Sequence, residues 1–271
     1  MNLTDRATVR VKATPGPSVL RSSSVLSVTQ TVILAAGSGS RLGSAALDLP
    51  KPLMTVGGIP LVAHALLHAH ASGCDEAIIV VGHQAARVRA AVEALKPQVR
   101  VRFVENADRE APNGMSLLAA EPLARPYFFL QMVDHLFGDV ALPRLVASPL
   151  AAGEAGRILV DRAPRDLDLS DATKVRRTGD RVTAIGKGLE PWDAIDTGCF
   201  VLTPAVFDAL RRAPASEPRT VSSGMRQLVA RGALGAVEVE DTQWVDVDTP
   251  ADLALAERLI RRGLKLQGAD C

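Results

Sequence analysis

The sequence predicts an α/β domain with a mostly parallel central sheet, helices on both faces and a small antiparallel addition in the second half. From Thr31 onward, short apolar runs alternate with longer segments of helical periodicity, a pattern typical of parallel strands joined by crossover helices. In the second half the apolar runs are shorter and are joined by turns such as Thr178-Gly179-Asp180, which indicates antiparallel pairing. The chain of 271 residues is 47% hydrophobic, so it can bury a sizeable core.

Strands and helices follow one another in the order that a doubly wound unit requires, up to about residue 150. In this half we predict strands over residues 31–36, 77–81, 99–104 and 127–133, and helices over residues 61–72 and 83–95. In the second half we predict strands over residues 157–160, 173–177, 181–185, 199–202 and 243–247, and helices over residues 204–212, 221–231 and 250–262.

The domain boundaries follow from the same patterns. No internal repeat or long linker separates the halves, so we expect one domain over residues 31–263, whose two halves (31–150 and 151–263) share one core with a cleft between them. Residues 1–30 are predicted to be a loosely ordered basic extension and residues 264–271 a tail.

Composition excludes several classes of function. The 31 Lys and Arg residues against 30 Asp and Glu residues give a net charge of +1, so no global field attracts nucleic acid. No segment approaches the roughly 18 to 20 apolar residues of a membrane span. Cys74, Cys199 and Cys271 form no CxxC motif, which argues against a zinc site or a disulfide framework and favours the cytoplasm.

The turn after the first predicted strand is the most informative segment. It reads Leu34-Ala35-Ala36-Gly37-Ser38-Gly39-Ser40-Arg41-Leu42-Gly43 and is followed by Leu49-Pro50-Lys51-Pro52-Leu53. Small residues after a buried strand let backbone N–H groups approach phosphates, while Arg41 and Lys51 can neutralise phosphate charge. The alternative is that Arg41 is a surface residue and Lys51 a solvated loop charge.

Two familiar nucleotide motifs do not match this turn. A GxGxxG motif counted from Gly37 would need glycine in place of Leu42, and a P-loop is absent because Lys51 follows Pro50. The predicted strand ending at Val81 is followed by Gly82 and not by the ribose-binding acid of an NAD site.

The string LAAGxGxRLG…LPKPL resembles the signature of GT-A-type nucleotidyltransferases, Rossmann-like enzymes that join a nucleoside triphosphate to a phosphorylated acceptor and release pyrophosphate. The resemblance extends from about Thr31 to Arg262. It narrows to CTP:inositol-1-phosphate cytidylyltransferases and related phosphonate cytidylyltransferases through five further segments, which are residues 113–118, 132–135, 171–175, 185–187 and 195–198.

The resemblance implies a nucleotide-binding half (residues 31–150), an acceptor-binding half (residues 151–263) and a role for each matching residue. The catalytic cations are Arg41, Lys51 and Lys187. The nucleotide-binding residues are Leu34, Ala35, Ala36, Gly37, Ser38, Gly39, Gly82, Asn113, Gly114 and Ser116. The acceptor-binding residues are Asp134, His135, Lys187, Asp196, Thr197 and Gly198, with Asp171 and Lys174 less firmly placed.

Two carboxylates are expected to hold the metal. Asp134 follows a predicted strand and so lies at the carboxyl end of that strand, and the resemblance implies that it binds Mg²⁺ together with Asp246. Strand alternation puts Asp248 on the same face as Asp246, but Asp248 can also be a cap for the helix that begins near Pro250.

The histidines receive no catalytic role. An acceptor phosphate is already anionic near neutral pH, so His135 is not expected to act as a general base, and a buried, hydrogen-bonded histidine is the alternative there. The remaining histidines, His64, His68, His70 and His83, are predicted to lie on helix surfaces or at a helix start.

The function implied is Mg²⁺-dependent transfer of CMP from CTP to a phosphorylated or phosphonate small molecule, by in-line attack of the acceptor oxygen on the α-phosphorus. The alternatives are a sugar-1-phosphate or phosphocholine nucleotidyltransferase, and a non-catalytic nucleotide-sensing protein on the same fold. The expected partners are CTP and the acceptor, without nucleic acid or a membrane span, and a homodimer is an open option. The sequence does not determine the acceptor or the choice between CTP and UTP.

Overall fold

The computed structural model describes residues 28–37, 39, 41–42, 49–108, 110–138, 141–164, 169–239 and 244–262. Residues 1–27 of the predicted extension and the predicted tail, residues 264–271, lie outside the described residues. Val28 is only 4% exposed and the first strand begins at Gln30, so the ordered core starts slightly before residue 31.

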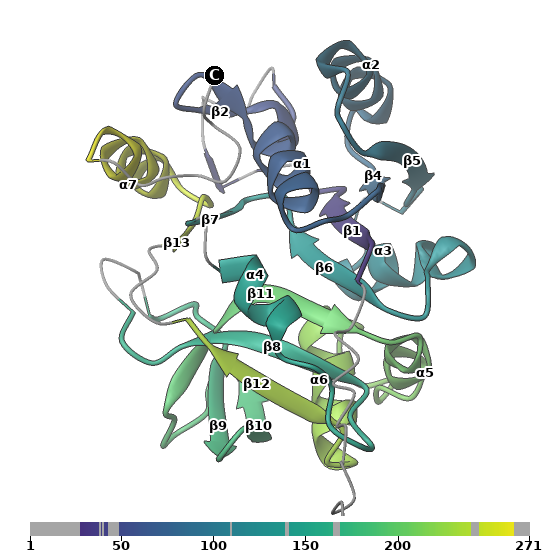
Figure 1. The fold of residues 1–271 in the computed structure, drawn as a ribbon, viewed down its shortest axis with the longest axis vertical. Helices are drawn as coiled ribbons and strands as arrows, with labels where there is room; N and C mark the ends of the chain where they lie inside the picture. The colour runs from purple at the N-terminus through teal and green to yellow at the C-terminus, as the bar shows by residue number, and fades with distance from the viewer. Residues whose placement is uncertain are drawn as a thin grey trace, which may run out of the picture.

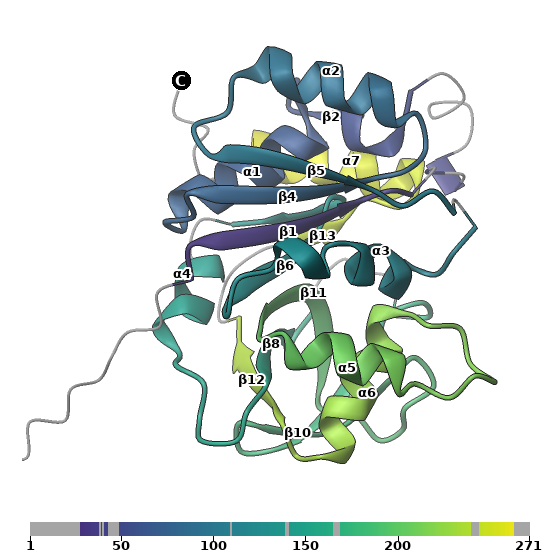
Figure 2. The ribbon, with the colours of Figure 1, turned by 90° about the vertical axis from the view of Figure 1, so that its right-hand side faces the viewer.

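A nine-stranded sheet runs through both halves of the chain, in the order β5-β4-β1-β6-β11-β8-β12-β10-β9. Its strands are β1 (Gln30–Ala35), β4 (Glu76–Val81), β5 (Arg100–Glu105), β6 (Phe128–Met132), β8 (Gly156–Asp161), β9 (Lys174–Thr178), β10 (Arg181–Gly186), β11 (Ala194–Leu202) and β12 (Leu234–Glu238). Strands β5, β4 and β1 lie in the upper part of Figures 1 and 2, and strands β8, β12 and β10 lie in the lower part. The antiparallel pair of β6 and β11 joins the two parts, and the last helix of the chain, residues 250–261, returns to the upper part.

The sheet is mixed, so the prediction of a mostly parallel sheet is not confirmed. Strands β5, β4, β1 and β6 are parallel to one another, as is the β8–β12 pair. Strand β11 is antiparallel to both β6 and β8, and β10 is antiparallel to β12 and β9. The antiparallel pairing predicted across the turn Thr178-Gly179-Asp180 is present, because β9 and β10 form an antiparallel pair there. The neighbours of β11 are set by contacts between distant segments, so its insertion between β6 and β8 was not predictable from periodicity.

Every strand and helix predicted from periodicity is present, with boundaries that differ by a few residues. The strand predicted over residues 243–247 is β13 (Trp244–Asp246), and residue 243 lies outside the described residues. Helix α4 (Ala141–Ala147) and strand β12 were not predicted, because both are too short to show a clear period.

Helices cover both faces of the sheet, as predicted. Alternation along β1 sends Val32 and Leu34 to one face and Ile33 and Ala35 to the other. The first face packs against α3 (Asn113–Ala119), α5 (Ala205–Arg211) and α6 (Val221–Ala230). The second face packs against α1 (Leu61–Ala71), α2 (Ala85–Leu95), α4 and α7 (Pro250–Arg261).

Several short elements arrange the edge where the site lies. They are the 3₁₀ turn η2 (Lys51–Leu53), the β2–β3 hairpin (Thr55–Val56 and Ile59–Pro60) and strand β7 (His135–Phe137). The 3₁₀ turn η3 (Glu121–Leu123) lies at the opposite edge, where the Leu123 carbonyl oxygen accepts from the Gln30 side chain at the start of β1. Strand β7 pairs with β13 in an antiparallel ladder in which His135 stands opposite Asp246. Two acids more than a hundred positions apart, Asp134 and Asp246, are thereby brought to one place.

The prediction that His64 and His68 lie on a helix surface is wrong. Both lie in α1 and are 1% exposed, because this helix is covered by η2 and β7 as well as by the sheet. His64 Nε2 donates to the carbonyl oxygen of Val56 at 2.9 Å. His70 is exposed, and His83 precedes the first turn of α2. Among the described residues, no helix is long and apolar enough to span a membrane.

Candidate active site

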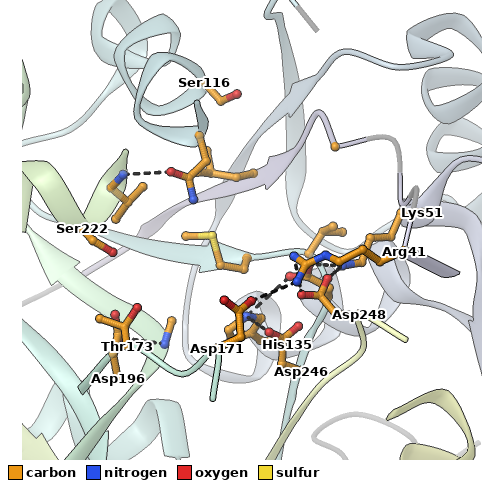
Figure 3. A pocket seen from close by; sticks show the side chains of 18 of the residues that line it. Arg41, Lys51, Ser116, His135, Asp171, Thr173, Asp196, Ser222, Asp246 and Asp248 are labelled. Atoms are coloured by element: carbon orange, nitrogen blue, oxygen red, sulfur yellow. Dashed lines mark hydrogen bonds and ion pairs between the residues drawn. The ribbon is translucent and has the colours of Figure 1, made fainter. Parts of the chain in front are cut away.

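A cavity of about 590 Å³ opens between the two halves of the domain. One side is formed by the carboxyl ends of β1 and β6 and by the residues that follow them, and the opposite side by loops and strands of the second half. Open α/β sheets bind ligands at this edge of their parallel strands. Figure 3 shows the cavity, with Arg41, Lys51 and Asp248 close together and Asp196 and Thr173 on the opposite side.

Lys51 is the buried cation of the cavity. It is the first residue of η2 and is 6% exposed, and its Nζ donates to the carboxylates of both Asp134 and Asp248. Burial by itself lowers the pKa of the Lys51 ammonium, but the carboxylates outweigh burial and hold the pKa above its ordinary value. Lys51 therefore remains charged at every physiological pH, and it is not the solvated loop charge of the alternative interpretation.

Arg41 joins the glycine-rich turn to the second half. Its Nη2 lies 2.7 Å from Asp248 Oδ2, and its Nη1 lies 3.0 Å from Asp171 Oδ2. The other oxygen of Asp171 accepts from Lys187 Nζ. Asp171 therefore links two of the predicted catalytic cations, and the Lys187 and Arg41 bonds hold the pKa of its carboxyl below the ordinary value.

Asp134, His135 and Asp246 form a cluster in which one ligand atom of each residue lies within 4.8 Å of the others. His135 Nε2 lies 3.4 Å from Asp246 Oδ2 and 3.7 Å from Asp134 Oδ1. Asp246 Oδ1 is buried and has no hydrogen-bond partner among the described residues. A buried, unpartnered carboxylate oxygen beside a second carboxylate suits a hard divalent cation, so Asp246 and Asp134 could hold Mg²⁺.

Asp248 is not the cap of the last helix. Thr249 is the N-cap of α7, and its hydroxyl accepts from the Asp252 backbone while the Asp252 carboxylate accepts from the Thr249 backbone. Each carboxylate oxygen of Asp248 faces a cation, Oδ1 facing Lys51 and Oδ2 facing Arg41. Asp248 therefore neutralises the charges of Lys51 and Arg41. Asp246, in contrast, has an oxygen without a hydrogen-bond partner among the described residues.

Burial and neighbouring carboxylates shift the pKa values of two further groups, His135 and Asp196. Burial lowers the pKa of the His135 imidazole, but Asp246 and Asp134 raise it more strongly, to about 10, so both ring nitrogens carry protons at neutral pH. Burial raises the pKa of the Asp196 carboxyl to about 6, although its Oδ1 accepts from the Gly198 N–H at 2.7 Å.

The residues of the glycine-rich turn divide between the cavity and the packing around it. Leu34, Ala36 and Gly37 line the cavity, whereas Ala35 is buried on the opposite face of the sheet. Ser38 lies outside the described residues.

Two of the predicted nucleotide-binding glycines make room for other parts of the protein. Gly39 has a φ of +72°, and a Cβ there would lie 2.9 Å from Lys51 Cβ. A Cβ on Gly82 would lie 2.9 Å from the Ala36 carbonyl oxygen. Neither glycine lines the cavity, so each allows close packing around the turn.

The predicted nucleotide-binding residues of α3 also differ in position. Asn113 and Ser116 line the cavity, and Ser116 Oγ accepts from Asn106 Nδ2 at 2.9 Å. Gly114 does not line it, and a Cβ there would lie 2.3 Å from the Arg219 carbonyl oxygen. The close approach at Gly114 is therefore to the loop that precedes α6 and to Leu210 of α5.

Most of the predicted acceptor-binding residues line the cavity together, namely Asp134, His135, Lys187, Asp196 and Gly198. Thr197 is fully buried, and its hydroxyl donates to the Leu159 carbonyl at 2.9 Å. Sequence reasoning missed Asn106, Thr173, Ser222 and Trp244, which also line the cavity. Two of them had a local signal, since Trp244 precedes Asp246 in the same strand and Thr173 lies in the segment 171–175 that carries the resemblance.

Comparisons with known proteins show the family to which the chain belongs. Residues 31–233 match the model of the MobA-like NTP transferase domain, and the chain belongs to that family.

Two relatives show which enzymes the chain is similar to. The chain is 35% identical over 230 residues to the bifunctional IPC transferase and DIPP synthase of Rubrobacter xylanophilus, covering 84% of this chain and 51% of the relative. It is 32% identical over 247 residues to the CMP-5'-(3-aminopropyl)phosphonate synthase of Streptomyces rubellomurinus, covering 84% of this chain and 38% of the relative. The chain thus spans about half or less of the length of these relatives.

A solved structure has the same architecture. The inositol-1-phosphate CTP transferase from T. maritima superposes with a TM-score of 0.77 at 26% identity, over 88% of this chain and 98% of that chain. The Rossmann-like GT-A architecture with a mixed sheet is therefore shared with a nucleotidyltransferase.

Proposed function

We propose that this protein is a Mg²⁺-dependent cytidylyltransferase that transfers CMP from CTP to a phosphorylated or phosphonate small molecule and releases pyrophosphate. The observation that carries the proposal is that Lys51, Arg41 and Lys187 line one cavity together with the acids Asp134 and Asp246. The names of the relatives, an IPC transferase, a phosphonate CMP synthase and an inositol-1-phosphate CTP transferase, support a cytidylyl donor and an acceptor of this class.

The cavity suits a reaction between two anions. A triphosphate and an acceptor phosphate repel each other, so the main barriers are charge repulsion and alignment. Lys51 is held rigidly by two carboxylates, and Arg41 and Lys187 approach from opposite halves of the domain. These cations can neutralise both substrates while the walls of the cavity hold them in line.

Asp134 and Asp246 would hold Mg²⁺, because their carboxylates lie together and Asp246 Oδ1 has no partner among the described residues. When bound, the ion supplies positive charge that stabilises phosphate oxygens. The acceptor oxygen is already anionic, so no side chain needs to remove a proton, and His135 is not assigned as a general base.

We further propose that the nucleotide lies against the first half (residues 31–150) and the acceptor against the second (151–263). Ser116, whose Oγ accepts from Asn106, lies in one part of the cavity in Figure 3, whereas Thr173 and Asp196 lie in another part. Lys187 also lines the cavity and belongs to the second half. A homodimer and a cytoplasmic location remain predictions.

A pyrophosphate-release assay tests the proposal. Four nucleoside triphosphates are crossed with inositol-1-phosphate, phosphocholine, hexose-1-phosphates and 2-hydroxyethylphosphonate, with Mg²⁺ or with a chelator. We expect release with CTP and one or more of inositol-1-phosphate and the phosphonate, lost in chelator and restored by Mg²⁺. Release only with a hexose-1-phosphate or phosphocholine would favour the other nucleotidyltransferases, and nucleotide binding without release would favour the sensing protein.

Two variants assign the chemistry to the cavity. Lys51→Ala and Asp134→Ala should each lower turnover by roughly 10²-fold or more, the scale of losing one preorganised electrostatic contact. Asp180→Ala changes an exposed acid in the turn between β9 and β10 and serves as the control. Turnover within a few-fold of the parent for both cavity variants, with folding intact, would contradict the proposal.

A further inference from the structure

His135 connects the acceptor side of the cavity to the two carboxylates proposed to hold the cation. It is the first residue of β7, and its Nδ1 lies 2.6 Å from the carbonyl oxygen of Thr197 in β11. A carbonyl oxygen can only accept, so Nδ1 carries the hydrogen and donates it. This bond fixes which edge of the ring faces β11 and therefore which edge faces the acids.

The ring is also fixed from two other sides. Gly198 has a φ of +75°, and a Cβ there would lie 2.4 Å from His135 Cε1 and 2.5 Å from Nδ1. The indole of Trp244 stacks on the imidazole at a centroid distance of 5.9 Å and an interplanar angle of 25°. Trp244 is held in turn, because its Nε1 donates to the buried Asp161 Oδ2 at 2.9 Å. The imidazole thus occupies a slot that a glycine leaves open and a tryptophan closes.

The remaining nitrogen, Nε2, faces the acids. It lies 3.4 Å from Asp246 Oδ2 and 3.7 Å from Asp134 Oδ1. The oxygens of Asp246 therefore have different surroundings: Oδ2 faces the histidine, whereas Oδ1 is buried and has no hydrogen-bond partner among the described residues. Holding one oxygen orients the other, which is how supporting groups act at metal sites.

We infer that His135 is a positioning residue that orients the Asp246 and Asp134 carboxylates for a divalent cation, and that Thr197 and Gly198 set the position of its ring. Strand β11, which carries the predicted acceptor-binding residues Asp196 and Gly198, is thereby coupled to the cation site through the His135 imidazole. This inference rests on the proposed Mg²⁺ site, but it concerns the order of the protein's own side chains and does not require turnover.

Mn²⁺ binding to the substrate-free full-length chain, followed by electron paramagnetic resonance at constant pH, tests the inference. We expect His135→Ala to weaken Mn²⁺ binding roughly 10- to 100-fold, as the loss of a supporting contact does at other metal sites. His135→Gln, whose amide nitrogen can reach the place of Nε2, should recover part of that loss. His70→Ala, an exposed histidine of α1, is the matched control and should bind Mn²⁺ as the parent does.

Gly198→Ala tests the coupling to β11. The added methyl group meets the imidazole, so this variant should weaken Mn²⁺ binding in the same direction as His135→Ala. The double variant should be no weaker than the weaker single variant, because both changes act through one ring. Gly188→Ala, where a Cβ would meet nothing within 4 Å, is the control. Should Gly198→Ala fail to fold, the comparison of His135→Ala with His135→Gln still tests whether His135 orients the carboxylates.

Several results would overturn the inference. The first is an Mn²⁺ affinity within twofold of the parent in a folded His135→Ala protein. The second is tighter Mn²⁺ binding by that variant, which is expected if the ring only repels cations. The third is the absence of Mn²⁺ binding by the parent. The proposed function fails separately, if the parent binds Mn²⁺ but releases no pyrophosphate with any substrate pair.

Discussion

Arg41 and Asp171 lie 130 positions apart in the sequence, yet Arg41 Nη1 and Asp171 Oδ2 are 3.0 Å apart across the mouth of the cavity. The side chains are 61% and 57% exposed, and Asp171 also accepts from Lys187. Exposed ion pairs contribute little to stability, so this arrangement matters chiefly for what binds there. The carboxylate lies between two cations, where a substrate phosphate would compete with it.

Removing this carboxylate should therefore strengthen substrate binding. We expect Asp171→Asn to lower the KM for the nucleotide and the acceptor about 3- to 10-fold at low ionic strength, with the effect shrinking as salt screens the charges. Steady-state kinetics at two salt concentrations measure it, with Asp180→Asn as the control. A rise in KM for the acceptor alone would show instead that Asp171 contacts the acceptor.

The buried ammonium of Lys51 should matter for stability as well as for turnover. Lys51→Met removes the cation that lies between Asp134 and Asp248, whose side chains are each 20% exposed. Breaking a largely buried pair leaves uncompensated charge, so we expect a loss of about 2 kcal/mol in the free energy of unfolding, measured by urea denaturation near pH 7.

Two companion variants separate this charge effect from packing. Lys187→Met removes an exposed ion pair and should change the free energy of unfolding by less than about 0.5 kcal/mol. Adding Asp248→Asn to Lys51→Met should recover part of the lost stability, because one of the two facing carboxylates then becomes neutral. An equal loss in the single and double variants would mean that packing, not charge, dominates.

Gly114 is expected to be a packing glycine. Gly114→Ala places a Cβ 2.3 Å from the Arg219 carbonyl oxygen, and backbone cannot yield as a flexible side chain can. We expect a loss of about 1 to 3 kcal/mol in stability, with the KM for CTP of the folded protein unchanged. Thermal unfolding and kinetics check this, and Gly188→Ala is the matched control. A higher KM without lost stability would restore the nucleotide-binding role.

The buried His68 should make the protein sensitive to acid. Burial lowers the pKa of this imidazole from 6.5 to about 4 in the folded state. Between these values the unfolded chain takes up a proton that the folded chain does not, so stability is complete above pH 6.5 and falls as the pH drops towards 4.

His68→Leu isolates that contribution. Across the interval from pH 6.5 to pH 4 this variant should lose less stability than the parent, by an amount on the order of 3 kcal/mol. Urea denaturation at several pH values measures the difference. His70→Leu, in the same helix but exposed, should retain the slope of the parent, and an identical slope in His68→Leu would contradict the prediction.

The elements of the fold were largely readable from local pattern, but their pairing was not. The alternation of Val32, Ile33 and Leu34 between the two faces shows why β1 reads as a buried strand. Nothing local indicates that β11 inserts between β6 and β8 and turns the sheet from parallel to mixed. The burial of His64 and His68 was missed for a similar reason, because what covers α1 comes from β7 and η2.

The residues of the candidate site were predictable from the sequence, but the contacts among them were not. The spacing of Arg41 and Lys51 after a glycine-rich turn, and of Asp134 after a strand, identified residues that do line one cavity. Which acid faces which cation depended on contacts between remote segments, and so Asp248 proved to pair with Lys51 and Arg41.

The sequence by itself determined the strands and helices, the glycine-rich turn and the set of charged residues available to bind phosphate, since all of these follow from residues near one another in the chain. Only the tertiary structure decided the order of the sheet, the slot that Gly198 leaves for His135, and the free oxygen of Asp246. The physical reason is that burial and pairing depend on which distant segments meet, and a local period of two or 3.6 residues carries no record of that partner.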